Sequence, residues 1–348
     1  MTAKKIGFTC TYTPVPIIEA AGFIPFRVFP ETDSKEQSGH MLHDNLCPHI
    51  KKVLDRALDD DLPELEGMVF INSCDSMRRL ADAWQEARPD DRVILLDLPS
   101  SNTDTSVAFL AEEYKRLLKT LCQWNRVDVS LDNLKTRIDA WNNLAQTLGM
   151  VEQAMNRNFY PDLASQYQAI INYAATQGVD KAFVKAKQID PDNMSVQKGR
   201  VPISIFGNLL FDPKVFDLFE EWNMHVVDND FCTGSRFFIP VDYNTSKDLF
   251  YTLALSWMRR TPCARTMDTF DPGGIAQKIV DKAKSSNARG VIGFTVKFCD
   301  PYLARIPMIR EALQKESIPF LMLEGDCTLG SIGQQQTRIE AFTEMLEV

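Results

Sequence analysis

The sequence predicts an α/β protein of two domains, each with a mainly parallel four-stranded sheet flanked by helices. Its 348 residues exceed what one hydrophobic core usually supports. Apolar runs of strand length alternate with helical patterns along the chain, as in βαβ units. The two halves also resemble each other around their third and fourth strands. We therefore expect an N-terminal α/β domain with a long helical extension, a helical connection and linker, and a C-terminal α/β domain, at residues 1–160, 161–200 and 201–348.

Four strands are expected in the first half, with helices between them. They are Lys5–Cys10, Phe23–Val28, Gly67–Asn72 and Val93–Leu98. After the fourth strand, apolar residues recur at helical spacing, and Ser101 or Thr103 can cap the helix that begins there. Helix is expected to about Gly149 and again over Pro161–Gln177, and a polar connection is expected over Asp180–Arg200.

The second half repeats the pattern of the first. Its expected strands are Val201–Gly207, His225–Asp228, Gly290–Val296 and Pro319–Leu323. Its expected helices lie near Pro213–Trp222, Lys247–Met258, Ile275–Ser285, Leu303–Lys315 and Gln334–Leu346.

A correspondence between the halves favours an internal duplication. The third strand of each half leads into a Cys-Asp pair at the start of a helix, Cys74-Asp75 in the first and Cys299-Asp300 in the second. The fourth strands are also similar, with Leu96-Asp97-Leu98-Pro99 beside Leu323-Glu324-Gly325-Asp326. A duplicated α/β unit is the economical interpretation, and shared strand chemistry alone is the alternative.

Composition excludes several classes of function. The apolar content of 45% and charged content of 24% are ordinary for a globular protein. No apolar stretch approaches the ~20 residues of a membrane span, and the first residues lead straight into a strand, so we expect a cytoplasmic protein without a membrane partner. The net charge of −9 argues against nucleic-acid binding. In a reducing compartment the eight cysteines are expected to bind metal, act in catalysis or be buried, rather than form disulfides.

The cysteines are the most informative residues of the chain. Six of the eight stand at strand exits or at junctions between a loop and a helix: Cys10, Cys47, Cys74, Cys232, Cys263 and Cys299. Ligand sites of parallel sheets lie at the carboxyl ends of the strands, and thiolates are the usual ligands of iron–sulfur clusters. This distribution predicts an iron–sulfur site, with burial as small apolar residues as the alternative. Cys122 lies within a helical pattern and is expected in the core, whereas Cys327 follows a fourth strand and could line the site.

Other kinds of site have weaker support. Structural zinc prefers C-x₂₋₄-C pairs, which the sequence lacks. A catalytic cysteine needs a histidine base, and the two histidines that flank Cys47, His43 and His49, are better explained by a solvated loop. No phosphate-binding loop is present, although the segment Leu329–Gly333 could hold an anion at the start of the last helix.

Two further groups of residues could complete an iron–sulfur site. Basic residues lie close to several cysteines in the sequence, where they would stabilise a negatively charged cluster or simply pair with surface carboxylates: Arg78, Arg79, Arg236, Arg265 and Lys297. An apolar entrance of Tyr12, Phe231 and Phe298 would shield a reduced centre, although core packing is the favoured explanation of these aromatic residues.

Several segments, in this order and spacing, resemble the 2-hydroxyacyl-CoA dehydratase and benzoyl-CoA reductase family from about residue 5 to residue 345. These segments are Gly7–Pro14, Ala20–Pro25, Asn72–Arg79, Leu96–Pro99, Lys297–Tyr302 and Leu323–Asp326. The resemblance implies two Rossmann-like domains, oxygen sensitivity, and an iron–sulfur centre that receives electrons from a separate ATP-hydrolysing activator protein with its own cluster. It also implies pairing as a homodimer or as a heterodimer with a homologous subunit.

The family has two branches that differ in their cluster. In the dehydratase branch three cysteines, which correspond to Cys47, Cys74 and Cys299, hold one 4Fe-4S cluster, and a ketyl radical of the acyl-CoA substrate expels the hydroxyl group. In the other branch six thiolates hold a double-cubane cluster of two 4Fe-4S units joined by a sulfide. Cys10, Cys232 and Cys263 bring this chain to six, which favours the double cubane. The position of Cys327 more often holds an aromatic residue in the family.

The resemblance leads to three hypotheses for function. The first is an iron–sulfur reductase that uses a double-cubane (8Fe-9S) cluster for difficult reductions. The second is a subunit of a 2-hydroxyacyl-CoA dehydratase with one 4Fe-4S cluster, and the third is a non-catalytic electron-transfer subunit. The substrate, a small molecule or an acyl-CoA, is not specified by any residue of the sequence.

Overall fold

The computed structural model describes residues 4–30, 36–245, 248–260, 263–268 and 271–347. Eight strands form two sheets of four: β1 (Lys5–Phe8), β2 (Ile24–Arg27), β3 (Gly67–Asn72), β4 (Val93–Asp97), β5 (Val201–Gly207), β6 (Met224–Asp230), β7 (Gly290–Val296) and β8 (Phe320–Gly325). The strand orders are β2-β1-β3-β4 and β6-β5-β7-β8, and every pairing is parallel. The expected pair of parallel sheets is confirmed, and each strand ends within two residues of its predicted bounds.

Fourteen α-helices surround the sheets in the described part of the chain. They are α1 (Val15–Ala20), α2 (Pro48–Leu58), α3 (Asp75–Ala87), α4 (Asp104–Asn125), α5 (Leu131–Arg157), α6 (Leu163–Gln177), α7 (Val179–Ala186), α8 (Lys214–Glu221), α9 (Leu249–Arg259), α10 (Gly274–Ser285), α11 (Asp300–Leu303), α12 (Ile306–Lys315), α13 (Leu329–Gly333) and α14 (Gln336–Glu347). Short 3₁₀ turns cover Ser38–His40, Pro191–Asn193, Ser235–Phe237 and Tyr243–Thr245.

Local sequence explains where the long helices begin. The Thr103 hydroxyl accepts a hydrogen bond from the Ser106 amide at the start of α4, which confirms the predicted cap. Ser130 and Asn133 form a reciprocal capping box at the start of α5. This helix continues past Gly149 to Arg157, because its buried positions keep helical spacing up to Met155.

Three other segments differ from the expected helices. Residues 179–186 form helix α7 rather than a polar connection, because Val179, Ala182 and Ala186 share one buried face. The helix expected over Leu303–Lys315 is divided into α11 and α12, with Pro307 in the first turn of α12. The last helix starts at Gln336, preceded by the short helix α13, and the expected start at Lys247 of another helix lies outside the described residues.

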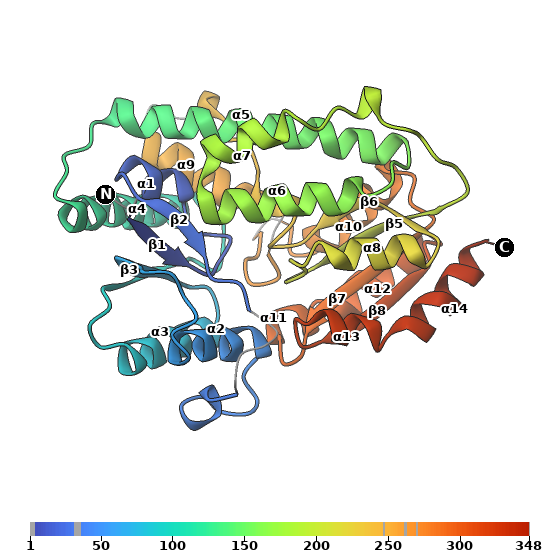
Figure 1. Cartoon of the computed structure of the whole chain (residues 1–348), viewed down its shortest axis with the longest axis horizontal. Helices are drawn as coiled ribbons and strands as arrows, with labels where there is room; N and C mark the ends of the chain where they lie inside the picture. Colours follow the sequence, from blue (N-terminus) through green and yellow to red (C-terminus); the bar gives the residue numbers. More distant parts are fainter. Residues whose placement is uncertain (1–3, 31–35, 246–247, 261–262, 269–270, 348) are drawn as a thin grey trace.

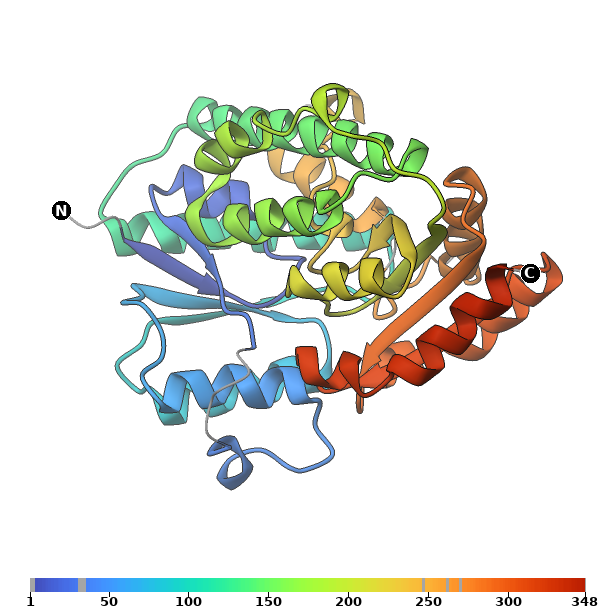
Figure 2. The same cartoon turned by 45° about the vertical axis from the view of Figure 1, so that its right-hand side comes forward.

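Helices of the chain's middle section tie the two sheets together. Figure 1 shows α5, α6 and α7 on one side of the molecule, spanning both sheets, and Figure 2 shows α2 and α3 on the opposite face of the first sheet. Helix α5 packs on both α1 and β6, α6 packs on both β2 and α8, and α4 packs along α9. The halves therefore share one apolar interior, in which Phe8 of the first half stacks on Phe237 of the second.

Trp141 is a central residue of this shared interior. It lies on α5, is fully buried, and donates a hydrogen bond from Nε1 to the Ile239 carbonyl oxygen at 2.9 Å. Its ring lies 4.5 Å from that of Phe238 and 5.5 Å from that of Trp257, measured between centroids. One side chain of α5 thus connects several elements of the second half.

We expect Trp141→Ala to lower the free energy of unfolding by about 3–5 kcal/mol, because it opens a large cavity and leaves the Ile239 carbonyl unpaired. Urea denaturation followed by circular dichroism measures the change. Met150→Ala is the matched control, since Met150 lies on the same helix with 62% of its surface exposed, and it should shift the value by no more than about 0.5 kcal/mol. Equal effects of the two substitutions would contradict the assigned role of Trp141.

Candidate functional site

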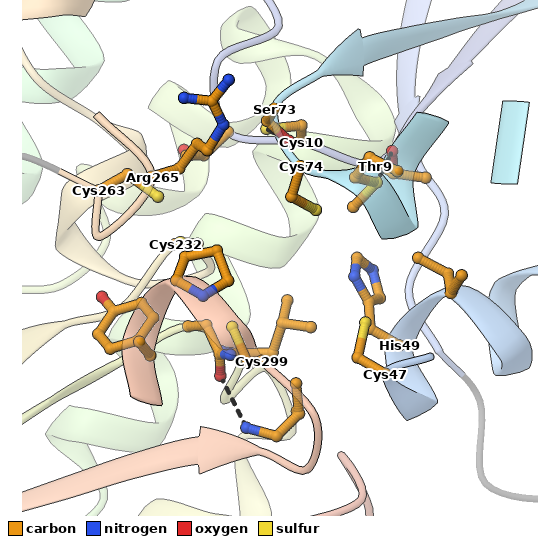
Figure 3. A pocket seen from close by; sticks show the side chains of 18 of the residues that line it. Thr9, Cys10, Cys47, His49, Ser73, Cys74, Cys232, Cys263, Arg265 and Cys299 are labelled. Atoms are coloured by element: carbon orange, nitrogen blue, oxygen red, sulfur yellow. Dashed lines mark hydrogen bonds between the residues drawn. The ribbon is translucent and has the colours of Figure 1, made fainter. Parts of the chain in front are cut away.

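One cavity lies where the carboxyl ends of strands from both sheets meet. Its empty space, counted with the open solvent at its mouth, is about 680 Å³. All six cysteines predicted from the sequence line it: Cys10, Cys47, Cys74, Cys232, Cys263 and Cys299. Figure 3 shows these side chains around the same space, with Cys263 and Arg265 on one side of the view and Cys47 and His49 on the other. The fold therefore brings together thiols that are up to 289 positions apart in the chain, from Cys10 to Cys299.

Each cysteine is positioned by the end of a strand or the start of a helix. Cys10 and Cys232 each lie two residues beyond a strand, β1 and β6. Cys47, Cys74 and Cys299 are the N-cap residues of α2, α3 and α11. Cys263 lies on the loop after α9, and the two residues that precede it in the sequence, Thr261 and Pro262, are outside the described residues. The cysteines thus lie at the carboxyl ends of the parallel strands, where the two sheets face one space.

We group the six thiols into two sets of three by which thiols contribute to one another's pKa shifts. In the first, which we call the helix-cap set, burial raises the pKa of Cys47, Cys74 and Cys299, and each of them has another member of the set as a further cause. In the second, which we call the arginine set, the Cys263 thiol donates a hydrogen bond to Cys232, and Cys232 in turn raises the pKa of the buried Cys10 thiol. Cys10 and Cys74 connect the two sets.

Buried arginines surround the arginine set. Arg236 is held by a 2.8 Å ion pair with Asp230, and its NH1 lies 3.6 Å from the Cys232 sulfur. Arg27 donates to the Cys232 carbonyl oxygen at 2.8 Å. The hydrogen bond from Cys263, followed by the charges of Arg236, Arg27 and Arg260, holds the pKa of Cys232 below its usual value despite burial. This end of the cavity consequently favours a thiolate.

Two of these arginines have no carboxylate partner. Arg27 is only 2% exposed and packs its guanidinium against the rings of Phe29 and Phe237. Arg260 is 5% exposed, lies over the Tyr12 ring at 4.2 Å, and donates from NH2 to the Thr11 carbonyl oxygen, while its Nε has no hydrogen-bond partner. Among the described residues, no carboxylate lies within ion-pair distance of either side chain. Burying an unpaired cation is unfavourable, so these residues fit a negatively charged body in the cavity.

The donor chemistry fits a thiolate-bound metal cluster. Six thiols line one space together with the buried Arg27 and the half-buried Arg265, and they match the ligands and counter-charges of an iron–sulfur cluster. Within the described part of the chain, no three His, Cys, Asp or Glu side chains are placed to hold a single metal ion.

Other lining residues shape the cavity without resembling ligands. His49 is buried on α2, and burial together with Arg27 lowers the pKa of its imidazole to about 3, so the ring is neutral. The Tyr302 hydroxyl donates to the Gly207 carbonyl oxygen and accepts from Arg236, both at 2.7 Å. Asn208 donates to Thr295 and accepts from the Val296 amide. These contacts hold the cavity wall in one arrangement.

One expectation about the neighbourhood of the cysteines was wrong, because His49 lies in the cavity wall and not in a solvated loop. Tyr12 and Phe231 are buried in the core, as the favoured interpretation predicts. Phe298 is 46% exposed and lies outside the lining, so these three residues form no aromatic entrance. Tyr302 is the aromatic residue that does line the cavity.

Some of the basic residues that lie near the cysteines in sequence reach the cavity, and others lie on the surface. Arg236 contacts Cys232, and Arg265 lines the cavity. Arg78 and Arg79 instead form surface ion pairs with Asp75, and Lys297 is exposed. Arg27 could not be singled out from sequence, because no cysteine lies near it in the chain, whereas Arg260 lies three residues before Cys263 and was missed.

The remaining candidates lie away from the cavity lining. Cys122 is half-buried on α4, beside a separate surface pocket, so the interpretation that it is no ligand is retained. Cys327 is buried near Cys47 and Cys299 but is not among the described lining residues. The segment Leu329–Gly333 forms α13, whose Ser331 amide is already bonded to Thr328, so the anion site expected at the start of the last helix is not formed by it.

Comparisons with known proteins agree with this geometry. None of the helices in the described part of the chain is long and apolar enough to cross a membrane. The chain is 24% identical to the (R)-phenyllactyl-CoA dehydratase beta subunit of Clostridium sporogenes, over 99% of its length and 92% of that protein. It is 24% identical to the beta subunit of lactoyl-CoA dehydratase from Anaerotignum propionicum, over 98% and 91%. It is 21% identical to one of the subunits of benzoyl-CoA reductase from Thauera aromatica, over 91% and 84%.

The family model for 2-hydroxyglutaryl-CoA dehydratase, D-component, matches residues 10–346. This match covers every strand except β1 and all six cysteines that line the cavity, and it confirms the resemblance found in the sequence motifs. The chain belongs to the 2-hydroxyglutaryl-CoA dehydratase D-component family, whose named relatives include beta subunits of dehydratases and one of the subunits of a benzoyl-CoA reductase.

Proposed function

We propose that the six cysteines hold a double-cubane iron–sulfur cluster, and that the protein uses electrons from an ATP-hydrolysing activator for difficult reductions. The observation that carries this proposal is the arrangement of six thiols around one cavity. Three thiolates for each cubane would use all six. When bound, such a cluster supplies electrons at a potential low enough for poorly reducible substrates.

The chain's own residues would hold and protect this centre. Within the arginine set, the hydrogen bond from Cys263 and then the charges of the buried arginines favour the thiolate of Cys232. Apolar side chains of the lining, including Ile50, Met77 and Val296, limit the access of water. His49 is neutral and therefore adds no positive charge to the helix-cap set.

A second candidate is a subunit of a 2-hydroxyacyl-CoA dehydratase with one 4Fe-4S cluster on Cys47, Cys74 and Cys299. The dehydratase names of the relatives favour it, and these three cysteines form the compact helix-cap set. In this case the arginine set would hold no iron. The two candidates therefore differ in iron content.

The proposed partners follow from the same comparisons. The relatives are named as subunits, which supports a homodimer or a heterodimer with a homologous subunit. An ATP-hydrolysing iron–sulfur activator would dock near the cavity and deliver single electrons. We further propose a cytoplasmic location, where an oxygen-sensitive centre meets such a donor.

Anaerobic purification followed by iron and sulfide analysis separates the candidates. We expect about eight irons per chain for a double cubane, because each of two cubanes contains four, and about four irons for a single cluster. A chain that contains no iron after anaerobic purification and cluster reconstitution would refute both.

Serine substitutions test which thiols bind iron, since a serine hydroxyl is a poor substitute for thiolate. We expect Cys263→Ser and Cys299→Ser each to remove about half of the iron or more. Cys122→Ser is the control and should retain the wild-type content, because Cys122 lies beside a different pocket. Full iron content in Cys263→Ser together with loss in Cys299→Ser would favour the single cluster instead.

A further inference from the structure

The two ends of the cavity differ strongly in charge. Three buried arginines lie at the arginine set, and the half-buried Arg265 lines the cavity beside Cys263. Near the helix-cap set, the arginines that follow Cys74 form ion pairs with Asp75 on the surface. Lys52 and Lys297 lie close to the carboxylate of Asp326. The positive field is therefore concentrated at one end.

Among the described residues, no carboxylate forms an ion pair with Arg27, which lines the cavity, or with Arg260, which lines a separate pocket. The charge of Arg236 is balanced by Asp230, which is itself as deeply buried as its partner. Arg27 and Arg260 are held by carbonyl oxygens and aromatic rings, which orient a guanidinium without cancelling its charge. In a water-poor interior, an unbalanced charge acts over a longer range than one at the surface.

From this asymmetry we infer that the half of the cluster bound by the arginine set accepts the first electron, and that Arg27 and Arg260 are positioning residues that place it there. The inference rests on the proposed double cubane. The step transfers one electron from a one-electron donor, which is oxidised by one unit, and it breaks no bond and moves no proton. The added negative charge would lie beside Arg236 and Arg27, which contact Cys232, whereas among the described residues no arginine forms a hydrogen bond with Cys47, Cys74 or Cys299.

The first test is a redox titration of variants followed by electron paramagnetic resonance under anaerobic conditions, with titanium(III) citrate as the donor. We expect Arg27→Met to lower the equilibrium constant for the first electron at least tenfold, about 59 mV for one electron, and to change the second step less. Arg27→Lys, which keeps the charge, should retain most of the wild-type value. Arg79→Met is the matched control, since Arg79 follows Cys74 but is exposed and paired with Asp75, and it should change neither step.

The location of the electron is read from the spectrum of the one-electron state. Cys263→Ser and Cys74→Ser should each lose about half of the iron, and we expect the iron that remains in Cys74→Ser to give the one-electron signal per iron while the iron that remains in Cys263→Ser does not, because the unpaired spin would lie at the arginine set. The reverse pattern would overturn the inference. Equal shifts of both reduction steps in Arg27→Met would overturn it as well.

The stability of the metal-free protein separates an electrostatic role from a structural one. Removing an unbalanced buried cation should leave the urea midpoint of the metal-free Arg27→Met variant unchanged or raise it, even though the cluster becomes harder to reduce. If Arg27 were needed only for packing, Arg27→Met would lower the urea midpoint and leave the difference between the two reduction steps unchanged. That result would count against the inference. Arg260→Met provides an independent variant with the same expected signs, should Arg27→Met not fold.

Failure of this inference is distinguishable from failure of the proposed function. Wild-type protein with about four irons or none would remove the double cubane itself. Wild-type protein with about eight irons, in which Arg27→Met and Arg260→Met leave the first step unchanged, would keep the cluster and reject the role of the arginines.

Discussion

The convergence of parallel strand ends on one cavity is the constraint on which the rest of this structure depends. Both sheets have the same strand order, and their carboxyl ends face the same space because α5 and α6 pack against both halves. Loops that leave those strands must therefore share that space. The chain uses the shared space to bring thiols and cations together, two kinds of group that are rarely gathered in an apolar interior.

The balance between burial and charge explains why the site has two unlike ends. Burial alone disfavours both thiolates and guanidinium ions, as the raised pKa of Cys47 and the lowered pKa of Arg27, about 10, both show. At Cys232 the hydrogen bond from Cys263, followed by the charges of Arg236, Arg27 and Arg260, outweighs burial and lowers the pKa. The pKa values of Cys10, Cys47, Cys74 and Cys299 stay raised because burial is their largest cause, and the pKa of Cys263 is raised first by its hydrogen bond to Cys232.

The sheets and all six lining cysteines could be predicted from sequence for a common reason. Strands of buried parallel sheets are continuous apolar runs, and a cysteine just beyond such a run is held at the sheet edge by local geometry. Arg27 could not be predicted in the same way, because it ends β2, and its distance from Cys232 depends on how two separate sheets are placed. His49 was misread because the turn that buries it is specified by the packing of α2, not by neighbouring residues.

The cysteines that make up each set come from both halves of the chain, which affects how the two halves are held together. Cys10 joins Cys232 and Cys263, and Cys299 joins Cys47 and Cys74, so each set draws on both halves of the chain. Metal bound by either set would link the two halves of the chain and close loops of more than two hundred residues. This link would add to the packing of α5 and α6 against both halves. Neither lobe produced on its own could complete a set, and assembly of the centre must wait until the last cysteine of each set has been synthesised and folded into place.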